Sequence, residues 1–236
     1  MTTSPTIVLV HGAFAESASW NGVITRLREH DLSVIAAANP LRSLSGDADV
    51  VAGLVSALDG PVVLVGHSYG GQVISNAVRG DDRVKALVFV AAFAPEEGES
   101  IAELSGRFPG STLGETLNAV PLPDGSTDLY IRQERYHAQF AADLPPERAA
   151  LDAVTQRPLN DQALHDKSGP QAWRDLPSWF VYPEMDFNIP LAAHRFMAER
   201  AGAREQLEIA GASHALPASQ PVAVADVILK AVQTVA

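Results

Sequence analysis

The sequence predicts an α/β fold: a mainly parallel sheet of about six strands, flanked by helices and interrupted by one helical insertion. Short, wholly apolar runs alternate with amphipathic stretches along the first 94 residues. The alternation breaks between Pro95 and Pro177, where nine of the sixteen prolines lie, and resumes at Ser178. Apolar runs of this kind are typical of strands buried on both faces, and their alternation with helices indicates parallel pairing.

Seven elements are predicted before the insertion. The first is a strand, because Ile7–Val10 is an unbroken apolar run that ends at His11-Gly12. A helix follows, because apolar residues recur at helical spacing from Trp20 to Leu27. Asp47 is placed to cap the next helix. The predicted order is strand 7–10, helix 19–30, strand 32–37, helix 47–58, strand 62–65, helix 70–79 and strand 84–93.

Residues 95–177 are predicted to form a helical insertion, because they contain helix-like stretches at 129–141 and 146–155 and no convincing apolar strand. The alternation then continues with strand 178–182, helix 191–201, strand 206–209 and helix 221–235. We therefore expect one sheet domain, residues 1–94 and 178–236, interrupted by one cap, residues 95–177.

The amino-acid composition excludes several classes of binding partner and of chemistry. The 236 residues include 17 basic and 28 acidic side chains, a formal net charge of −11, and the average field of such a chain repels nucleic acid and anionic membranes. The absence of cysteine excludes disulfides, thiolate nucleophiles and cysteine-ligated metals. No apolar run has the length of a membrane span, and the first residues lack the features of a secretory signal. The expectation is a cytoplasmic protein that acts on a small molecule, with neither nucleic acid nor membrane as partner and with no prediction of oligomeric state.

The strongest chemical motif is Gly66-His67-Ser68-Tyr69-Gly70-Gly71, which follows strand 62–65 and opens a helix. This is the context that a G-x-S-x-G nucleophile elbow requires. The turn forces the serine into a strained backbone conformation, and side chains in place of the flanking glycines would collide with the neighbouring strand or helix. The motif predicts that Ser68 presents its hydroxyl as a nucleophile at the edge of the sheet.

A serine hydroxyl needs a base to take its proton and an acid to orient that base. His214 follows the last predicted strand and Asp186 follows strand 178–182, so both would lie on loops at the same edge of the sheet as Ser68. Glu184 is a rival acid two residues earlier. Asp186 is preferred because it precedes the Ile-Pro start of a helix, although a role as a loop or capping carboxylate stays open.

The loop after the first strand, His11-Gly12-Ala13-Phe14, is expected to place the backbone N–H of Ala13 opposite that of Tyr69. Two such donors aimed at one point form an oxyanion hole. His11 itself is predicted to be structural, with its ring bonded to the loop backbone. His67 is predicted to point away from the site, as a packed or surface imidazole.

No cofactor and no metal are expected. The remaining histidines share no ligand spacing with carboxylates; they are His30, His137, His165 and His194. The glycine-rich elbow is not followed by the Lys-Ser/Thr pair of a phosphate loop, and no G-x-G-x-x-G motif lies near the first strand.

Together, the His11-Gly12 strand end, the Ser68 elbow, Asp186 with Ile189-Pro190, and Gly211-Ala-Ser-His214-Ala resemble the α/β-hydrolase superfamily over nearly the whole chain. The order serine, acid, histidine is the one found in that fold. The start directly on the His-Gly strand and the compact cap are similar to the small branch of plant methylesterases and hydroxynitrile lyases and to bacterial esterases of the same shape. The resemblance implies that Ser68 is the nucleophile, His214 the base, Asp186 its orienting acid, and Ala13 and Tyr69 the oxyanion donors.

Lyases of that branch carry a threonine directly after the strand histidine and a lysine directly after the base histidine. Here these positions are Gly12 and Ala215, so the lyase mechanism is disfavoured. The expected activity is cofactor-free hydrolysis of a small carboxylic ester through an acyl-enzyme.

Two alternatives stay open, a small-molecule binding protein of this fold and a cofactor-free haloperoxidase or perhydrolase. The aromatic residues of the cap are as consistent with a substrate pocket as with a core of the cap itself; they are Phe108, Tyr136, Phe140 and Trp173.

Overall fold

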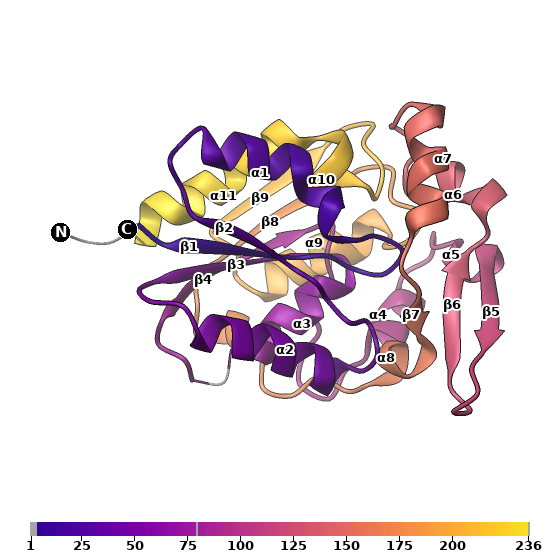
Figure 1. Cartoon of the computed structure of the whole chain (residues 1–236), viewed down its shortest axis with the longest axis horizontal. Helices are drawn as coiled ribbons and strands as arrows, with labels where there is room; N and C mark the ends of the chain where they lie inside the picture. Colours follow the sequence, from indigo (N-terminus) through magenta and orange to yellow (C-terminus); the bar gives the residue numbers. More distant parts are fainter. Residues whose placement is uncertain (1–3, 79, 236) are drawn as a thin grey trace.

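The computed structural model describes residues 4–78 and 80–235. Its centre is a six-stranded, wholly parallel sheet in the order β2-β1-β3-β4-β8-β9 (Figure 1), which confirms the predicted α/β class. Every residue of β3 and β8 is buried, as their apolar sequences predict. The strands are β1 (Thr6–Val10), β2 (Val34–Ala37), β3 (Val62–His67), β4 (Val84–Val90), β8 (Ser178–Pro183) and β9 (Glu205–Ile209).

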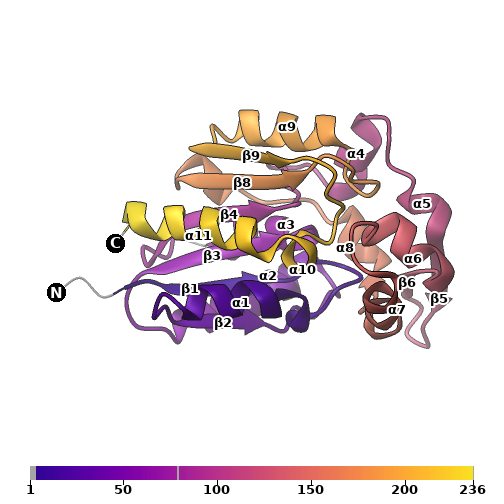
Figure 2. The same cartoon turned by 90° about the horizontal axis from the view of Figure 1, so that it is seen from above.

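Helices cover both faces of this sheet (Figures 1 and 2). One face packs against η1 (Ser17–Trp20), α1 (Asn21–Arg28), α10 (Leu216–Ser219) and α11 (Pro221–Val235), with Trp20 and Ile228 fully buried between the layers. The other face packs against α2 (Leu44–Ser56), α3 (Tyr69–Ala77) and α9 (Leu191–Arg200). From β1 the chain adds β2 on one side and β3 on the other, so the direction of strand addition reverses between β1 and β3. The loops that follow these two adjacent strands lie next to each other, and ligands usually bind at this position in such folds.

Helix α2 begins three residues earlier than its predicted start. Its N-cap is Ser43, whose side chain accepts the N–H of Gly46. Asp47, the predicted cap, lies in the first turn, where its two oxygens accept the N–H of Arg42 and the hydroxyl of Tyr69. Arg42 directly precedes the N-cap and Tyr69 begins α3, so helical spacing alone reveals neither partner. Arg79, the predicted end of the following helix, lies outside the described residues.

Residues between β4 and β8 are not entirely helical, contrary to the prediction. They form six short helices and an antiparallel sheet in the order β5-β6-β7. The elements are α4 (Ile101–Arg107), α5 (Leu113–Thr116), β5 (Leu117–Pro121), β6 (Thr127–Ile131), α6 (Gln133–Phe140), α7 (Pro146–Thr155), β7 (Leu159–Asn160), α8 (Asp161–His165) and η2 (Ala172–Arg174).

The stretch 129–141, predicted as one helix, is the end of β6 followed by α6. A tight turn makes the difference: Gly125 has φ 87°, and the N–H of Leu122 donates to the carbonyl of Ser126 at 2.8 Å, which closes the β5-β6 hairpin. The side chain of Gln156 then pairs with both the N–H and the carbonyl of Ile131, each at 2.9 Å, and so substitutes for a neighbouring strand.

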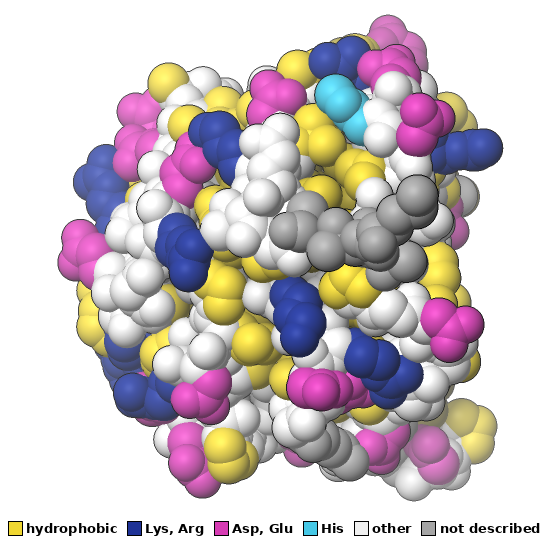
Figure 3. All heavy atoms as spheres, turned by 90° about the vertical axis from the view of Figure 1, so that its left-hand side faces the viewer, with side chains coloured by type: hydrophobic (Ala, Val, Ile, Leu, Met, Phe, Trp, Pro, Cys, Tyr) yellow, Lys and Arg dark blue, Asp and Glu magenta, His cyan; other side chains and the backbone are white. Residues whose placement is uncertain are grey.

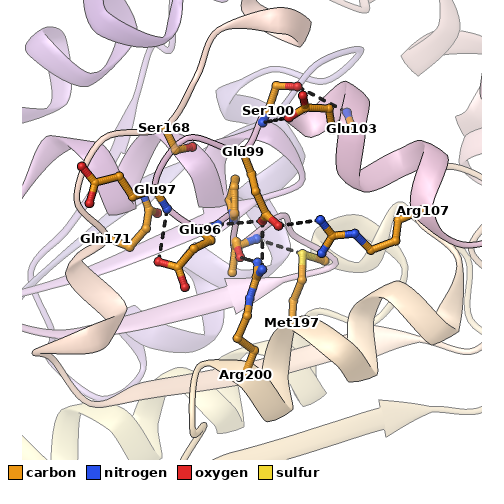
Figure 4. A network of polar contacts seen from close by, with 12 residues as sticks. Glu96, Glu97, Glu99, Ser100, Glu103, Arg107, Ser168, Gln171, Met197 and Arg200 are labelled. Atoms are coloured by element: carbon orange, nitrogen blue, oxygen red, sulfur yellow. Dashed lines mark hydrogen bonds and ion pairs between the residues drawn. The ribbon is translucent and has the colours of Figure 1, made fainter.

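These inserted elements lie at the carboxyl ends of the central strands (Figures 1 and 2). Their first segment is bonded to α9 through Glu99, which pairs with Arg107 at 2.7 Å and with Arg200 at 2.9 Å (Figure 4). Burial alone would raise the pKa of Glu99, but the N–H of Glu96 and the two guanidinium groups outweigh it and hold the pKa below its usual value. At the opposite end of the molecule, acidic and basic side chains are interspersed with hydrophobic ones (Figure 3).

Candidate active site

The serine of the G-x-S-x-G motif lies at the sharp turn between β3 and α3. Ser68 has φ 54°, a strained conformation for a residue with a side chain, and its N–H is held by the carbonyl of Val90 at 3.2 Å. A Cβ on Gly66 would lie 2.5 Å from the carbonyl oxygen of Gly70, and a Cβ on Gly70 would lie 2.4 Å from that of Val10. Only glycine fits at both places, which is the packing that the motif predicts.

Three of the predicted side chains form one hydrogen-bonded chain. His214 Nε2 lies 2.9 Å from Ser68 Oγ, and His214 Nδ1 lies 2.7 Å from Asp186 Oδ2. The loops after β3, β8 and β9 supply the three residues, so the carboxyl ends of three parallel strands bring them together. All three are buried, and Ser68, at 7% exposed, is the most accessible of them.

The carboxylate of Asp186 is ionised and fixed. Burial alone would raise its pKa, but the rings of His214 and His194 beside it outweigh burial and hold the pKa well below its usual value. The rival acid, Glu184, turns elsewhere: its Oε2 accepts the N–H of Gly211 at 2.9 Å. The geometry therefore favours Asp186 as the partner of His214.

The loop after β1 lies directly against the elbow. A Cβ on Gly12 would approach Ser68 Cβ to 2.5 Å and Tyr69 N to 3.1 Å. The N–H of Ala13 has no hydrogen-bond partner among the described residues, and the N–H of Tyr69 is the first of helix α3, a position without an intrahelical acceptor. The loop of Ala13 and the first residue of α3 thus lie next to each other at Ser68.

Inserted residues support this loop. Phe14 has φ 60°; its N–H donates to the carbonyl of Arg157 at 2.9 Å, and its carbonyl accepts the hydroxyl of Tyr136 at 2.8 Å. Both the N–H and the carbonyl of Phe14, the residue after Ala13, are therefore bonded to the segment between β4 and β8.

Two buried histidines hold the surrounding backbone. The N–H of Asn39 donates to His11 Nε2 at 3.2 Å, so Nδ1 of His11 carries the proton and donates to the carbonyl of Gly12 at 2.9 Å. Burial lowers the pKa of His11 to about 4, which agrees with its predicted structural role. His67 is packed, as one of its two predicted alternatives has it, but it also touches the site: its Nε2 lies 3.0 Å from the carbonyl oxygen of His214. Burial lowers the pKa of His67 to about 3.

Tyr69, which follows the serine, is bonded through its ring as well. Its hydroxyl donates to Asp47 Oδ2 at 2.8 Å. Burial raises the pKa of both groups, and the bond links the start of α3 to α2.

The aromatic residues of the insertion divide into two groups. Phe140 packs against His214, with ring centroids 4.9 Å apart, and Tyr136 stacks on Phe140. Phe108 instead packs on Phe196, and Trp173 donates its indole N–H to the carbonyl of Pro95. Tyr136 and Phe140 therefore border the site, whereas Phe108 and Trp173 belong to the base of the insertion.

Two polar residues at the site are not predicted from the sequence. His194 Nε2 lies 2.9 Å from Asp186 Oδ2. Gln139 donates to the carbonyl of Phe187 at 2.8 Å and to Asn188 Oδ1 at 3.0 Å, which connects α6 to the loop of Asp186. The only sequence signal for His194 is its position eight residues after Asp186, and no known motif has that spacing.

The described residues, 4–78 and 80–235, offer neither a metal site nor a membrane span. Within these ranges no group of three or more histidine and acidic side chains is arranged to hold a metal ion. No helix there is both long enough and apolar enough to cross a bilayer.

Comparison with known proteins gives consistent matches over most of the chain. The model of the alpha/beta hydrolase family matches residues 7–227. Esterase PIR7B of Oryza sativa subsp. japonica is 27% identical over 258 aligned residues, which cover 94% of this chain and 94% of that protein. Salicylic acid-binding protein 2 of Nicotiana tabacum is 27% identical over 175 residues, 69% of this chain and 67% of that protein. The crystal structure of polyneuridine aldehyde esterase superposes with a TM-score of 0.82 at 19% identity, covering 97% of this chain and 99% of that one, a likeness of fold.

Proposed function

Because the chain belongs to the alpha/beta hydrolase family, we propose that it is a serine hydrolase that cleaves a small carboxylic ester through Ser68, His214 and Asp186. The observation that carries the proposal is the continuous chain from Ser68 Oγ through His214 to Asp186 Oδ2, with contacts of 2.9 and 2.7 Å. Relatives named as esterases, among them PIR7B and polyneuridine aldehyde esterase, support an ester as the substrate class.

Acylation begins when Ser68 Oγ attacks the ester carbonyl and His214 Nε2 takes its proton. Negative charge develops on the carbonyl oxygen, between the N–H groups of Ala13 and Tyr69. One such donor typically contributes about 3–4 kcal/mol to transition-state stabilisation. His214 then protonates the leaving alkoxide, and the acyl group stays on Ser68.

Deacylation reverses the roles with water as the nucleophile. His214 Nε2 takes a proton from water, which attacks the acyl carbonyl, and then returns that proton to Ser68 as the acid leaves. Asp186 stays ionised throughout, since its pKa lies well below the usual range. It holds Nδ1 of His214 as the donor and so leaves Nε2 free to accept.

Residues 95–177 act in this proposal as a cap over the site. Tyr136 and Phe140 provide apolar walls next to His214, and Gln139 connects the cap to the loop of Asp186. The lyase alternative is disfavoured further by crowding: a threonine at position 12 would need room for a Cβ only 2.5 Å from Ser68 Cβ.

The test is hydrolysis of a panel of p-nitrophenyl esters from acetate to longer and aromatic acids, with a Ser68→Ala variant as the matched control. We expect turnover by the wild type and a loss of roughly a thousandfold or more in kcat for Ser68→Ala, the size found when a triad member is removed. Mass spectrometry after a rapid quench should find the acyl group on Ser68.

Other results would point elsewhere. Turnover that does not depend on Ser68, or none on any ester, would contradict the proposal and favour a binding protein. Peroxide-dependent halogenation that exceeds ester hydrolysis would favour the haloperoxidase alternative.

A further inference from the structure

The carboxylate of Asp186 meets a second imidazole that this mechanism does not use. His194, near the start of α9, places Nε2 2.9 Å from Asp186 Oδ2, the same oxygen that His214 Nδ1 reaches at 2.7 Å. The side chains of both histidines are only 1% exposed. We propose that His194 is a positioning residue of the triad, whose Nε2–H holds Oδ2 of Asp186 in front of His214. The inference rests on the proposed function of Ser68, His214 and Asp186.

The other bonds to this carboxylate come from its own loop. Oδ1 of Asp186 accepts the N–H groups of Asn188 and Ile189 at 2.8 and 2.9 Å. Because these donors lie within three residues of Asp186, they shape the loop but do not fix it to the rest of the molecule. His194 belongs to a helix packed on the sheet, so its bond ties the carboxylate to that layer.

Helix α9 is itself well held. The ring of His194 stacks in parallel on Tyr182 of β8, with centroids 5.4 Å apart and planes at 3°. At the far end of the helix, Arg200 pairs with Glu99 and donates to the carbonyl of Ala94 at 2.8 Å (Figure 4). The donor offered to Asp186 is therefore fixed by contacts with both the sheet and the insertion.

The ring of His194 is a neutral donor. Its Nδ1 is buried and has no hydrogen-bond partner among the described residues, so a proton there would be an unpaired donor in a buried site. Burial also lowers the pKa of His194, despite the neighbouring carboxylate. The proton thus sits on Nε2, facing Asp186, and the carboxylate keeps its full charge for His214. A cation in this place would neutralise part of that charge.

The neutral donor has a consequence for the pH dependence of catalysis. A hydrogen bond to Asp186 is stronger while His214 is neutral, because an imidazolium would already compensate the carboxylate. Removal of the His194 donor should therefore change how the rate of catalysis depends on pH. The titratable groups that face this cluster are Tyr182 on β8, Asp186 and His214 on their loops, and His67 behind His214.

The experiment compares two substitutions at this position. His194→Leu removes the donor and puts an apolar side chain of similar length in its place, whereas His194→Gln keeps an N–H donor that cannot ionise. His165→Leu, at an exposed histidine of the insertion, is the matched control. Three measurements are made on each protein: the rate at which a fluorophosphonate probe labels Ser68, kcat and KM on a p-nitrophenyl ester across pH, and the downfield proton NMR signal of His214 Nδ1–H.

We expect His194→Leu to lower kcat and the labelling rate by about tenfold to a hundredfold with little change in KM, the loss expected for a hydrogen bond to a buried charged group. The acidic limb of its kcat/KM profile should move to higher pH, and the NMR signal should shift or broaden. His194→Gln should have rates and an NMR signal close to those of the wild type. His165→Leu should be indistinguishable from the wild type.

Wild-type rates and an unchanged NMR signal in His194→Leu would overturn the inference. If His194→Leu does not fold, His194→Gln decides: full activity supports the role, and a folded but impaired protein with an unchanged signal refutes it. A wild type that the probe does not label would instead contradict the proposed function, and the NMR signal would still report the position of Asp186.

Discussion

Lowering the pH from 7 to 5 should destabilise this protein through the two buried histidines beside the elbow. Burial lowers the pKa of His11 to about 4 and that of His67 to about 3, whereas a histidine in an unfolded chain has a pKa of about 6.5. As the pH falls from 6.5 toward 4, the unfolded chain binds protons at these positions and the folded chain does not. The free energy of unfolding therefore decreases over that window.

The size of the effect follows from the two pKa values. Between pH 7 and pH 5, each histidine should lower the free energy of unfolding by about 2 kcal/mol. The pair together accounts for a large share of the roughly 5–15 kcal/mol that stabilises a typical domain. His194, whose pKa burial also lowers, acts in the same direction. The stabilisation that ionised Asp186 provides is lost only at lower pH, because its pKa is held well below the usual range.

Urea unfolding followed by tryptophan fluorescence at pH 7 and at pH 5 measures this loss. His67→Gln keeps a polar group near the carbonyl of His214 but cannot titrate, so its loss between the two pH values should be about 2 kcal/mol smaller than that of the wild type. His165→Gln, at an exposed position, serves as the control and should lose as much as the wild type. Equal losses in His67→Gln and the wild type would refute the reasoning.

Three further predictions concern the loop of Ala13 and the base of the insertion. Gly12→Ala places a Cβ 2.5 Å from that of Ser68; we expect about 1–3 kcal/mol less stability in urea and a large drop in ester kcat, and unchanged kinetics would contradict the crowding. Tyr136→Phe removes the bond to Phe14; kcat should fall severalfold, as for the loss of about 1 kcal/mol, with KM nearly unchanged, whereas a rise in KM alone would show that Tyr136 acts on substrate binding. Glu99→Gln leaves Arg107 and Arg200 without their carboxylate; thermal unfolding should show a loss of about 1–3 kcal/mol with initial rates retained at 25 °C, and an unshifted melting temperature would argue against the network.

The parts of this molecule that depend on local sequence could be predicted. Five of the six parallel strands follow from short, mainly apolar runs, β9 alternates polar and apolar residues instead, and the position of Ser68 follows from the glycines that the turn requires. The grouping of Ser68, Asp186 and His214 could be expected as well, because parallel strands end at one edge and each residue lies on the turn or loop that follows a strand.

The parts that depend on contacts between distant segments could not. Asp47 has the spacing of a helix cap, but its carboxylate accepts the hydroxyl of Tyr69 on α3 as well as the nearby N–H of Arg42. The strands of the insertion are short and β5 ends at Pro121, so their alternation is weak, although Asp124-Gly125 is typical of a hairpin turn. His194 has no local signature at all, because its partner is defined by how α9 packs.

The two bonds that join Phe14 to Arg157 and Tyr136 bear on any attempt to change specificity by exchanging the insertion. A chimera that receives another protein's segment in place of residues 95–177 keeps Ser68, His214 and Asp186, yet Phe14 retains its partners only if the new segment supplies a carbonyl and a hydroxyl in the same places. Exchange of this segment therefore changes substrate range and turnover at the same time. A graft chosen for its pocket must also be chosen for the two atoms that steady the loop of Ala13.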